Sequence, residues 1–248
     1  MPLDLSGTDE LTRFAVQAYW QTLAAQSAKQ SAKAGRGQAD RGTRAAVTGG
    51  KQMDGFGRLI EHVLLRNGLK NSHVYQDSKL ELPGYFRPTK KWDILVVHEG
   101  VLLAAMEFKS QRGPSFGNNF NNRTEEAVGT GHDFATALRE GVLGKKHPMP
   151  WLGWVMLLED CAKSNAPVDV AEPHFAVFRE FKGSSYSKRY ELMLRKLVRE
   201  RLYDCAAFIT ATESGGSRGD YSEPASDMTM KKFLASLSGH VVAYVAGR

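Results

Sequence analysis

The chain has 248 residues, of which 42% are hydrophobic, 10% aromatic and 24% charged. This composition is typical of a globular protein with a sizeable core, and it excludes chains that are mainly disordered, collagen-like or membrane-spanning. Lysine and arginine number 33 against 27 acidic residues, and the net charge of +6 favours an anionic partner, with nucleic acid ahead of an acidic membrane surface.

The N-terminal part of the chain combines an amphipathic pattern with a basic stretch. Apolar residues recur at three- and four-residue steps from Thr8 to about Ser27, which predicts a helix. The following segment, Lys29–Gln52, carries six basic residues against one acid, Asp40, among small and polar residues. We expect a flexible basic arm over about 29–52, which holds nearly all of the net charge.

The next part of the chain changes from a helical to a strand pattern. A helix is expected over Asp54–Asn67, where apolar side chains line one face and a glycine follows. Two short apolar runs come later, Trp92–Val97 and Val101–Phe108, separated by His98-Glu99-Gly100. They predict a buried β-hairpin whose turn takes all three intervening residues.

The second half of the chain alternates helical and strand patterns. We expect helices over Thr124–Glu140, Tyr186–Tyr203 and Thr229–Val245, and Thr124 is the expected cap of the first. Strands are expected over Trp154–Leu158 and Phe208–Thr210. An exposed loop rich in glycine and serine is expected over Glu213–Ser226. The last helix is either a contact surface or part of the core. The alternation favours a single α/β domain over residues 1–248 with a mixed sheet.

Three charged residues interrupt the apolar hairpin strands: Asp93 on the first, and Glu107 and Lys109 on the second. In the expected register Asp93 faces Ala105, Glu107 is its diagonal neighbour, and all three charged residues share one face opposite an apolar core face. Two such carboxylates tend to hold a proton or a divalent cation, and Mg²⁺ suits these oxygen ligands. A lysine beside them can act on a scissile phosphate or orient water, so the pattern predicts metal-assisted hydrolysis.

Asp93, separated by thirteen residues from Glu107-Phe108-Lys109, resembles the PD-(D/E)xK nuclease signature, although Trp92 stands where that signature often has proline. Longer segments are similar to the XhoI family of type II restriction endonucleases over most of the chain, apart from the first thirty-odd residues and the Glu213–Ser226 loop. These segments are Met53–Phe56, Leu82–Lys90, Phe108–Gln111, Gly113–Ala127, Pro173–Phe175, Gly183–Tyr186 and Lys188–Tyr190.

The resemblance implies a restriction-endonuclease-like mixed β-sheet core flanked by α-helices, and Mg²⁺-dependent cleavage of double-stranded DNA at the palindrome CTCGAG. It would make Asp93 and Glu107 metal ligands and Lys109 the catalytic lysine. Asp54 is a tentative further ligand, but it can equally be the N-cap of its helix, and Glu61 on that helix is an equal rival.

The same resemblance implies an assembly and a setting. Cleavage of both strands of a palindromic site requires two symmetric active sites, so a homodimer is expected. The last helix is one possible contact surface between the two subunits. A companion DNA methyltransferase and a bacterial, cytoplasmic location are implied by the family alone.

Two segments are candidates for contact with DNA, because amides match adenine edges, arginine matches guanine, and helix starts bind phosphate. An expected loop, Gly113–Arg123, offers Asn118, Asn119, Asn121, Asn122 and Arg123, and the start of the basic helix offers Ser184, Ser185, Lys188 and Arg189. Simpler alternatives are a turn that favours asparagine and a solvated helix face.

Two other functions stay open. A serine hydrolase would use Ser115 in a G-x-S-x-G pattern, but no partner histidine is evident and an asparagine-rich run separates this serine from the expected helix. A non-catalytic DNA-binding protein would account for the net charge but not for buried charges on the hairpin.

The cysteines and the N-terminus carry less information. Cys161 and Cys205 are isolated, which excludes a CxxC pair and a four-ligand zinc site. Residues 1–5 show no basic start before an apolar run, and no stretch approaches the ~18–20 apolar residues of a membrane span. We expect a soluble protein of a reducing cytoplasm.

Overall fold

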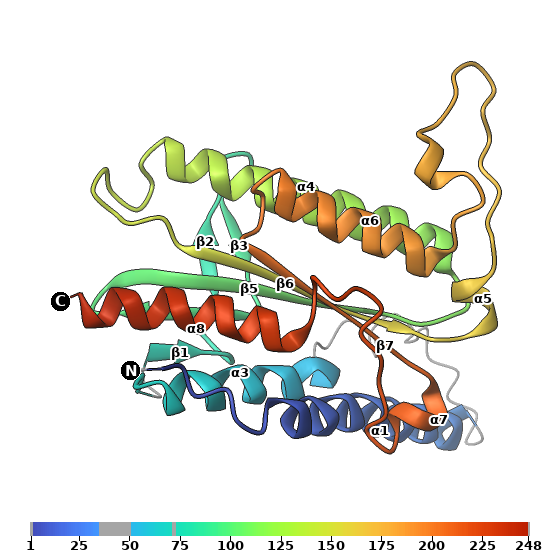
Figure 1. Cartoon of the computed structure of the whole chain (residues 1–248), viewed down its shortest axis with the longest axis horizontal. Coiled ribbons are helices and arrows are strands. Elements are labelled where there is room, and N and C mark those ends of the chain that lie inside the picture. Colours follow the sequence, from blue (N-terminus) through green and yellow to red (C-terminus); the bar gives the residue numbers. More distant parts are fainter. Residues whose placement is uncertain (1, 35–50, 71–72, 248) are drawn as a thin grey trace.

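The computed structural model describes residues 2–34, 51–70 and 73–247, and its centre is a five-stranded mixed sheet (Figure 1). The strand order is β1-β4-β5-β6-β7, with bounds Val74–Tyr75, Ile94–His98, Val101–Gln111, Trp151–Glu159 and Cys205–Ala211. The pairs β1·β4 and β4·β5 are antiparallel, whereas β5·β6 and β6·β7 are parallel. The predicted α/β class with a mixed sheet is therefore confirmed.

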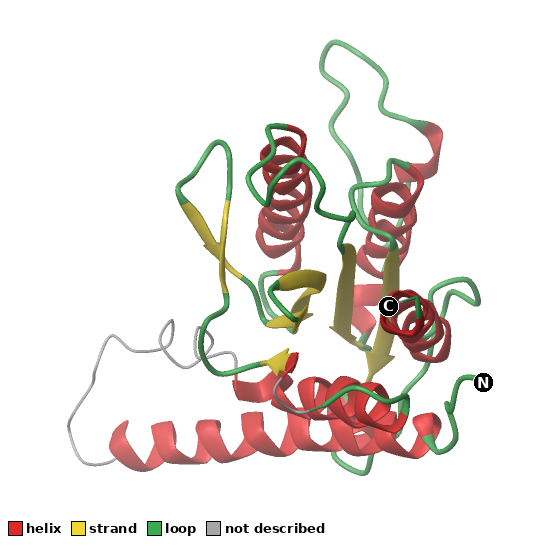
Figure 2. Cartoon of the chain, turned by 90° about the vertical axis from the view of Figure 1, so that its left-hand side faces the viewer, coloured by secondary structure: helices red, strands yellow, loops and turns green. Residues whose placement is uncertain are grey.

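Helices cover both faces of this sheet (Figures 1 and 2). On one face lie α4, Phe116–Arg139, and α6, Tyr186–Arg199, which connect the parallel strands as crossovers. On the other face lie α1, Thr8–Ala34, α3, Asp54–Arg66, and α8, Met230–Ala246. Two apolar clusters fill the two interfaces, so the face expected to hold only the charged residues is also packed core.

Shorter elements complete the fold. A two-stranded hairpin, β2 at Glu81–Pro83 and β3 at Thr89–Lys91, stands apart from the central sheet beside α4 (Figure 2). The remaining pieces are η1 at Lys51–Met53, α5 at Ala162–Asn165, η3 at Arg179–Phe181 and α7 at Glu213–Gly216. No helix in the described ranges is long and apolar enough to cross a membrane.

The β4–β5 hairpin was predicted correctly, but its register was not. Glu99 and Gly100 both have positive φ, 49° and 78°, so the turn takes two residues and His98 pairs with Val101. A β-bulge then skips Leu103, after which Ile94 pairs with Met106. Asp93, the residue just before β4, therefore lies across from Glu107 of β5. The expected register placed it across from Ala105.

The largest difference concerns α4, which begins at Phe116 and not at Thr124. Four asparagines in five residues weaken the helical signal because asparagine has low intrinsic helix propensity. Packing overrides that preference: Phe116 is 2% exposed and stacks on Tyr186, and Phe120, one turn later, meets Tyr190 edge to face. The expected Gly113–Arg123 loop is therefore mostly helix.

Other boundaries also moved. Helix α1 continues to Ala34, so residues 29–34 of the expected flexible arm are helical, while residues 35–50 lie outside the described residues. Within the expected exposed loop Glu213–Ser226, Gly215, Gly216 and Ala225 are buried. The helices α3 and α8 lie where predicted, with small changes at their ends, whereas β6 and β7 contain the expected strands but are about twice as long.

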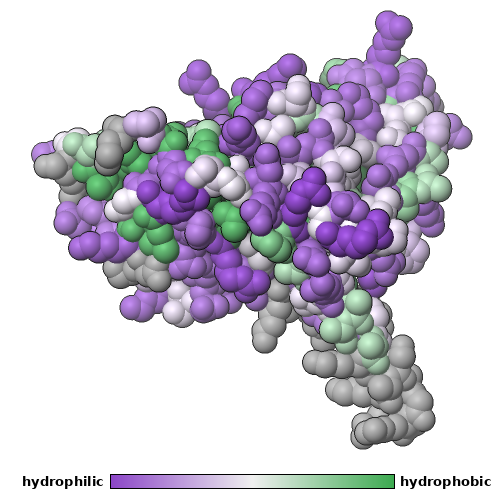
Figure 3. Space-filling model, turned by 60° about the horizontal axis from the view of Figure 1, so that its bottom comes forward, coloured by the Kyte–Doolittle hydropathy of each residue, from purple (hydrophilic) through white to green (hydrophobic). Residues whose placement is uncertain are grey.

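The last helix, α8, fills the core. Thr229 is its N-cap and accepts a hydrogen bond from the Lys232 amide at 3.2 Å. Phe233, Leu234 and Leu237 are fully buried, which confirms core packing as the role of that face. The molecular face around α1 and α3 is mainly hydrophilic, with scattered apolar patches (Figure 3), as expected of helices whose apolar sides face the sheet.

Candidate active site

Asp93 is fixed at the end of the β4–β5 ladder. Its backbone N–H donates to the carbonyl of Met106 at 3.1 Å, and its Oδ2 accepts the N–H of Phe108 at 2.7 Å. The side chain thus completes the ladder just before β4 begins, while 39% of it stays exposed to solvent. It has an oriented carboxylate with one face still open.

Glu107 lies in the middle of β5 with a side chain that is 1% exposed. Its two oxygens are each held by an ammonium group: Lys90 Nζ is 2.5 Å from Oε1, and Lys109 Nζ is 2.5 Å from Oε2. Burial raises the pKa of Glu107 above its ordinary value; Lys109 opposes this rise, whereas the charge of Asp93 adds to it. The short contacts to both lysines fix the carboxyl group in a single position.

Lys109 joins three carboxylates. Besides Glu107, its Nζ is 3.1 Å from Glu126 Oε1 and 3.8 Å from Asp93 Oδ2. Burial alone would lower the pKa of this lysine, but the surrounding carboxylates outweigh burial and raise it. The structure therefore brings the three residues of the predicted triad together, with the lysine charged and central.

Glu126 on α4 belongs to the same cluster, and the sequence did not indicate it. Expected to lie in the first turn of a helix that began at Thr124, it lies in the third turn, facing β5. It binds Lys109 and, at 2.8 Å, Arg123 Nη1 one turn earlier. Burial acts to raise the pKa of Glu126, but Lys109 and Arg123 lower it more strongly. The one signal in the sequence was the i, i+3 pair of Arg123 and Glu126.

An acidic cavity opens beside Asp93. It has a volume of about 460 Å³ and lies between α3, β4 and the β2–β3 hairpin. Four carboxylates line it, together with Arg58 and Lys91: Asp54, Glu61, Asp77 and Asp93. The cavity gives a ligand access to the open face of the Asp93 carboxylate.

The two rival acids of α3 both lie on this cavity wall. Asp54 is the first residue of the helix, whose N-cap is Met53, so the prediction that Asp54 is the cap was wrong. Glu61 accepts a hydrogen bond from Gln76 at 2.7 Å. Across the described ranges, no three histidine, cysteine or carboxylate side chains converge closely enough to hold a metal ion. Neither acid therefore forms a three-ligand set with Asp93 and Glu107.

Asp93 and Glu107 nevertheless fit a hard divalent cation as a pair. Their oxygens already converge on one cation, the ammonium of Lys109, at 3.8 and 2.5 Å. Magnesium is usually held by one or two carboxylates, with waters and substrate oxygens completing its shell. The cavity beside Asp93 provides room for those further ligands.

The asparagines of the candidate DNA-binding segment lie on the first turns of α4. Asn118, Asn121 and Asn122 are exposed, and their three- and four-residue spacing places them on one helix face. Asn119 is half-buried. Arg123 points inward to Glu126, so it contributes to the charged cluster and not to the exposed face.

The candidate residues at the start of α6 have partners within the protein. Ser185 is the N-cap and accepts the Lys188 amide at 3.2 Å, while Lys188 Nζ binds Glu191 at 2.9 Å. Ser184 is 7% exposed and accepts a hydrogen bond from Arg189 Nε at 3.1 Å. In this conformation, these side chains stabilise the helix start.

Ser115 lies at the N-cap of α4, directly after strand β5 and a short connection. The strand-to-helix context that the serine hydrolase alternative requires is therefore present, contrary to expectation. No histidine of the described residues, however, has a hydrogen bond to its hydroxyl, so the site lacks the base that would activate it.

The mixed sheet with helices on both faces, and an acid, acid and lysine at the β4–β5 hairpin, defines a restriction-endonuclease-like protein. The family model described as restriction endonuclease XhoI matches residues 31–223. The chain belongs to this family, and it is therefore a Type II restriction endonuclease that acts on DNA.

Curated relatives agree with this assignment. The Type II restriction enzyme BstVI of Geobacillus stearothermophilus is 52% identical over 84% of this chain and 94% of its own length. The Type II restriction enzyme XhoI of Xanthomonas vasicola is 50% identical over 80% of this chain and 78% of its own. The Type II restriction enzyme AbrI of Azospirillum brasilense is 47% identical over 72% of this chain and 79% of its own length. No solved structure matches the chain.

Proposed function

We propose that this endonuclease hydrolyses phosphodiester bonds in double-stranded DNA at the palindrome CTCGAG, with Mg²⁺ held by Asp93 and Glu107 and with Lys109 as the catalytic lysine. The observation that supports it best is the convergence of both carboxylates on one ammonium at the hairpin. The recognition sequence comes from the family resemblance.

Each residue has a distinct task in this proposal. The bound metal would polarise the scissile phosphate and neutralise charge that develops on it. Asp93 is positioned by the Phe108 amide and supplies the solvent-accessible ligand. Glu107 supplies the buried one, and Lys109 stabilises the pentacovalent phosphate or orients the attacking water. Glu126 holds the ammonium from α4, whereas Glu107 holds it from β5, and so Glu126 helps to set the direction in which Lys109 points.

In this proposal the exposed asparagines of α4 read DNA next to the catalytic centre. Lys109 binds Glu126, which lies one turn beyond Asn122 on the same helix. DNA whose phosphate reaches the cluster would therefore pass close to Asn118, Asn121 and Asn122. Each well-formed bidentate amide contact with adenine would contribute roughly 1–3 kcal/mol of discrimination.

The remaining parts of the proposal concern assembly. A palindrome presents two identical half-sites, and a homodimer would place one cluster on each strand. A companion methyltransferase would protect the host's own sites. Sedimentation of the purified enzyme with and without a CTCGAG duplex tests the dimer, and a monomer in both conditions would contradict it.

The central experiment is digestion of two plasmids, with and without one CTCGAG site, in Mg²⁺ or in chelator. We expect cleavage only of the first plasmid and only with Mg²⁺. Asp93→Asn should abolish cleavage while DNA binding persists, whereas Asp169→Asn, a change of an exposed acid outside the cluster, should leave cleavage intact. Equal cutting of both plasmids would refute the specificity, and full activity of Asp93→Asn would refute the site.

A further inference from the structure

Lys90 lies inside the charged cluster although it comes from the small β2–β3 hairpin and not from the central sheet. Its Nζ is 2.5 Å from Glu107 Oε1, and the two side chains are 16% and 1% exposed. Lys109 occupies the other oxygen of the same carboxylate. Both oxygens of the buried metal ligand proposed above are therefore already occupied by ammonium groups.

The cluster is also electrically balanced. Its six members are three acids, Asp93, Glu107 and Glu126, and three bases, Lys90, Lys109 and Arg123. A divalent cation added to this set would leave a charge of +2 in a largely buried place, which is costly unless a positive group leaves or negative charge arrives. Metal binding at Glu107 is therefore favoured when a positive group leaves, when negative charge arrives, or when both happen together.

Of the two ammonium groups on Glu107, that of Lys90 is the one that can leave. Lys109 lies two residues from Glu107 on the same central strand and also holds Glu126. Lys90 has only the Lys91 carbonyl and the Trp92 ring as further partners among the described residues. It extends from a two-stranded hairpin that pairs with no strand of the central sheet.

We propose that Lys90 is a positioning residue that occupies the metal's place at Glu107 Oε1 in the DNA-free enzyme and leaves it when DNA binds. The proposal rests on the function proposed above. DNA phosphates supply both the alternative anion for Lys90 and the negative charge that balances the metal. The free enzyme would accordingly bind metal weakly, and DNA would increase its affinity for the metal.

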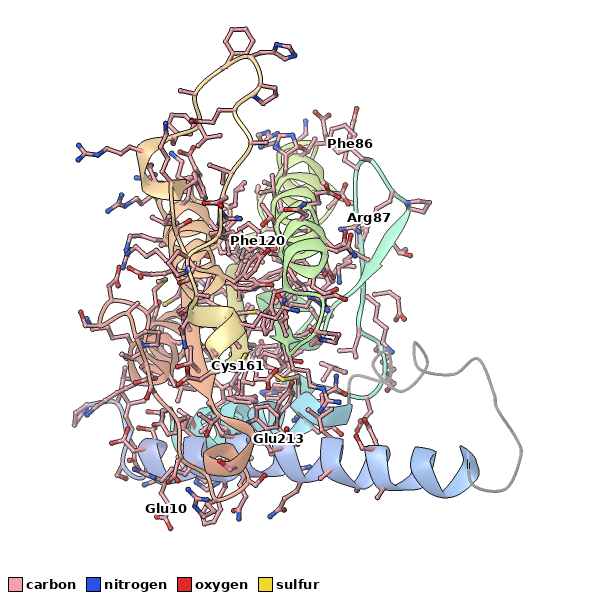
Figure 4. All side chains as sticks on the ribbon, turned by 90° about the vertical axis from the view of Figure 1, so that its right-hand side faces the viewer. Glu10, Phe86, Arg87, Phe120, Cys161 and Glu213 are labelled. Carbon is pink, nitrogen blue, oxygen red and sulfur yellow. The ribbon has the colours of Figure 1, made fainter. Side chains whose placement is uncertain are left out.

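The geometry of the hairpin supports a link with DNA. Its tip, Tyr85-Phe86-Arg87, lies three residues from Lys90 and carries exposed aromatic rings, with Phe86 and Arg87 projecting beside α4 (Figure 4). The hairpin is joined directly to the charged cluster, because Lys90 of β3 reaches Glu107 of β5. A contact of DNA with the hairpin would therefore act directly on the Lys90–Glu107 pair.

Terbium luminescence can measure the metal site without cleavage, since Tb³⁺ prefers oxygen ligands and is sensitised by nearby tryptophan. Two tryptophans are close: the Trp92 ring is 5.6 Å from Lys90 Nζ, and the Trp154 ring is 5.6 Å from Lys109 Nζ. The titration compares DNA-free wild type with Lys90→Met, Lys90→Arg and Lys91→Met. Lys91 lies on the same strand, is exposed and lines the cavity, so its variant controls for simple loss of a charge.

We expect Lys90→Met to bind Tb³⁺ about tenfold or more tightly than wild type, because one unit of positive charge a few ångströms from the cation is removed. Lys90→Arg should bind as weakly as wild type, and Lys91→Met should change affinity much less than Lys90→Met. Unchanged or weaker binding by Lys90→Met would refute the proposal, and weaker binding is what a purely structural role predicts. An equal gain in Lys91→Met would also refute it.

Two further titrations separate this proposal from the proposed function. In wild type, a CTCGAG duplex should increase Tb³⁺ affinity, and the increase should be smaller in Lys90→Met. Asp93→Asn should remove the signal in every background. A Tb³⁺ signal that does not depend on Asp93, with or without DNA, would refute the metal site itself. An Asp93-dependent signal with no effect of Lys90→Met would refute only the role of Lys90.

Discussion

Asp133 of α4 fixes the β2–β3 hairpin, and its replacement by alanine is the most direct test of how this hairpin is held. The side chain is 6% exposed, and Oδ1 accepts the N–H groups of Tyr85 and Phe86 at 2.7 and 2.8 Å. Oδ2 accepts Arg87 Nε at 2.8 Å. Gly84 lies against the same carboxylate, where any Cβ would collide with Oδ2.

The magnitude follows from these contacts. A hydrogen bond to a charged group contributes about 1.5–3 kcal/mol, but water can reach part of the hairpin tip and the Arg87 side chain is 40% exposed. We therefore expect Asp133→Ala to lower the free energy of unfolding by about 2–4 kcal/mol. Asp133→Asn keeps an oxygen for the two amides and should cost about 1 kcal/mol.

Urea denaturation of both variants, with Asp169→Asn as an exposed control, measures these differences. Although burial acts to raise the pKa of Asp133, the Phe86 and Tyr85 amides and Arg87 lower it more. A carboxyl with a lowered pKa stabilises the fold above its unfolded pKa of about 3.9, and this contribution is lost as pH falls below that value. The difference in the free energy of unfolding between wild type and Asp133→Asn should therefore become smaller as the pH is lowered. An Asp133→Ala variant as stable as Asp133→Asn would refute the reasoning.

Three further predictions concern catalysis and DNA. Glu126→Gln should lower kcat at least about tenfold with little change in KM, because Lys109 loses the carboxylate that holds it from α4. Glu125→Gln is the control and should match wild type in single-turnover cleavage. Equal cleavage rates of the Glu126→Gln and Glu125→Gln variants would contradict the role of Glu126. Asn122→Ala should weaken binding to CTCGAG by about 1–3 kcal/mol but not to unrelated DNA, as measured by fluorescence anisotropy. Deletion of residues 35–50 should reduce the salt dependence of DNA binding by roughly 0.9 in log–log slope for each phosphate that this segment neutralises, and an unchanged slope would exclude the arm from the interface.

The sequence predicted the β4–β5 hairpin and its charged residues because their signal is local. A short, nearly continuous apolar run marks each strand, and a charged residue in such a run is conspicuous. Register depends on finer details, here two positive φ angles at Glu99 and Gly100 and a bulge at Leu103. The expected three-residue turn gave the correct shared face for Asp93, Glu107 and Lys109, but it shifted Asp93 along the partner strand.

Helix α4 and the rest of the cluster could not be predicted in this way. The start of α4 is set by Phe116 and Phe120 packing on Tyr186 and Tyr190, which are about seventy residues away in the chain. Glu126 reaches Lys109 only because the helix begins two turns earlier than its composition suggests. Contacts between distant segments, and not local propensity, decide these positions.

The net positive charge and the charged cluster at Glu107 are located in different parts of the chain. Outside Lys29–Gln52 the chain is within one unit of neutrality, so nearly all of the net positive charge lies in that one segment. The six charged side chains around Glu107 sum to zero and attract a metal ion only weakly before a phosphate arrives, so the acidic cavity beside Asp93 is the main source of attraction for a cation in the free enzyme. If Lys90 holds the metal's place, the order of events follows from electrostatics: DNA would bind first and draw Lys90 onto a phosphate, and Glu107 and Asp93 would only then be free to hold a metal ion. An enzyme with this order would form its cleavage centre only on bound DNA, and Lys90→Met, which frees Glu107 Oε1 in advance, should show metal binding that depends much less on DNA.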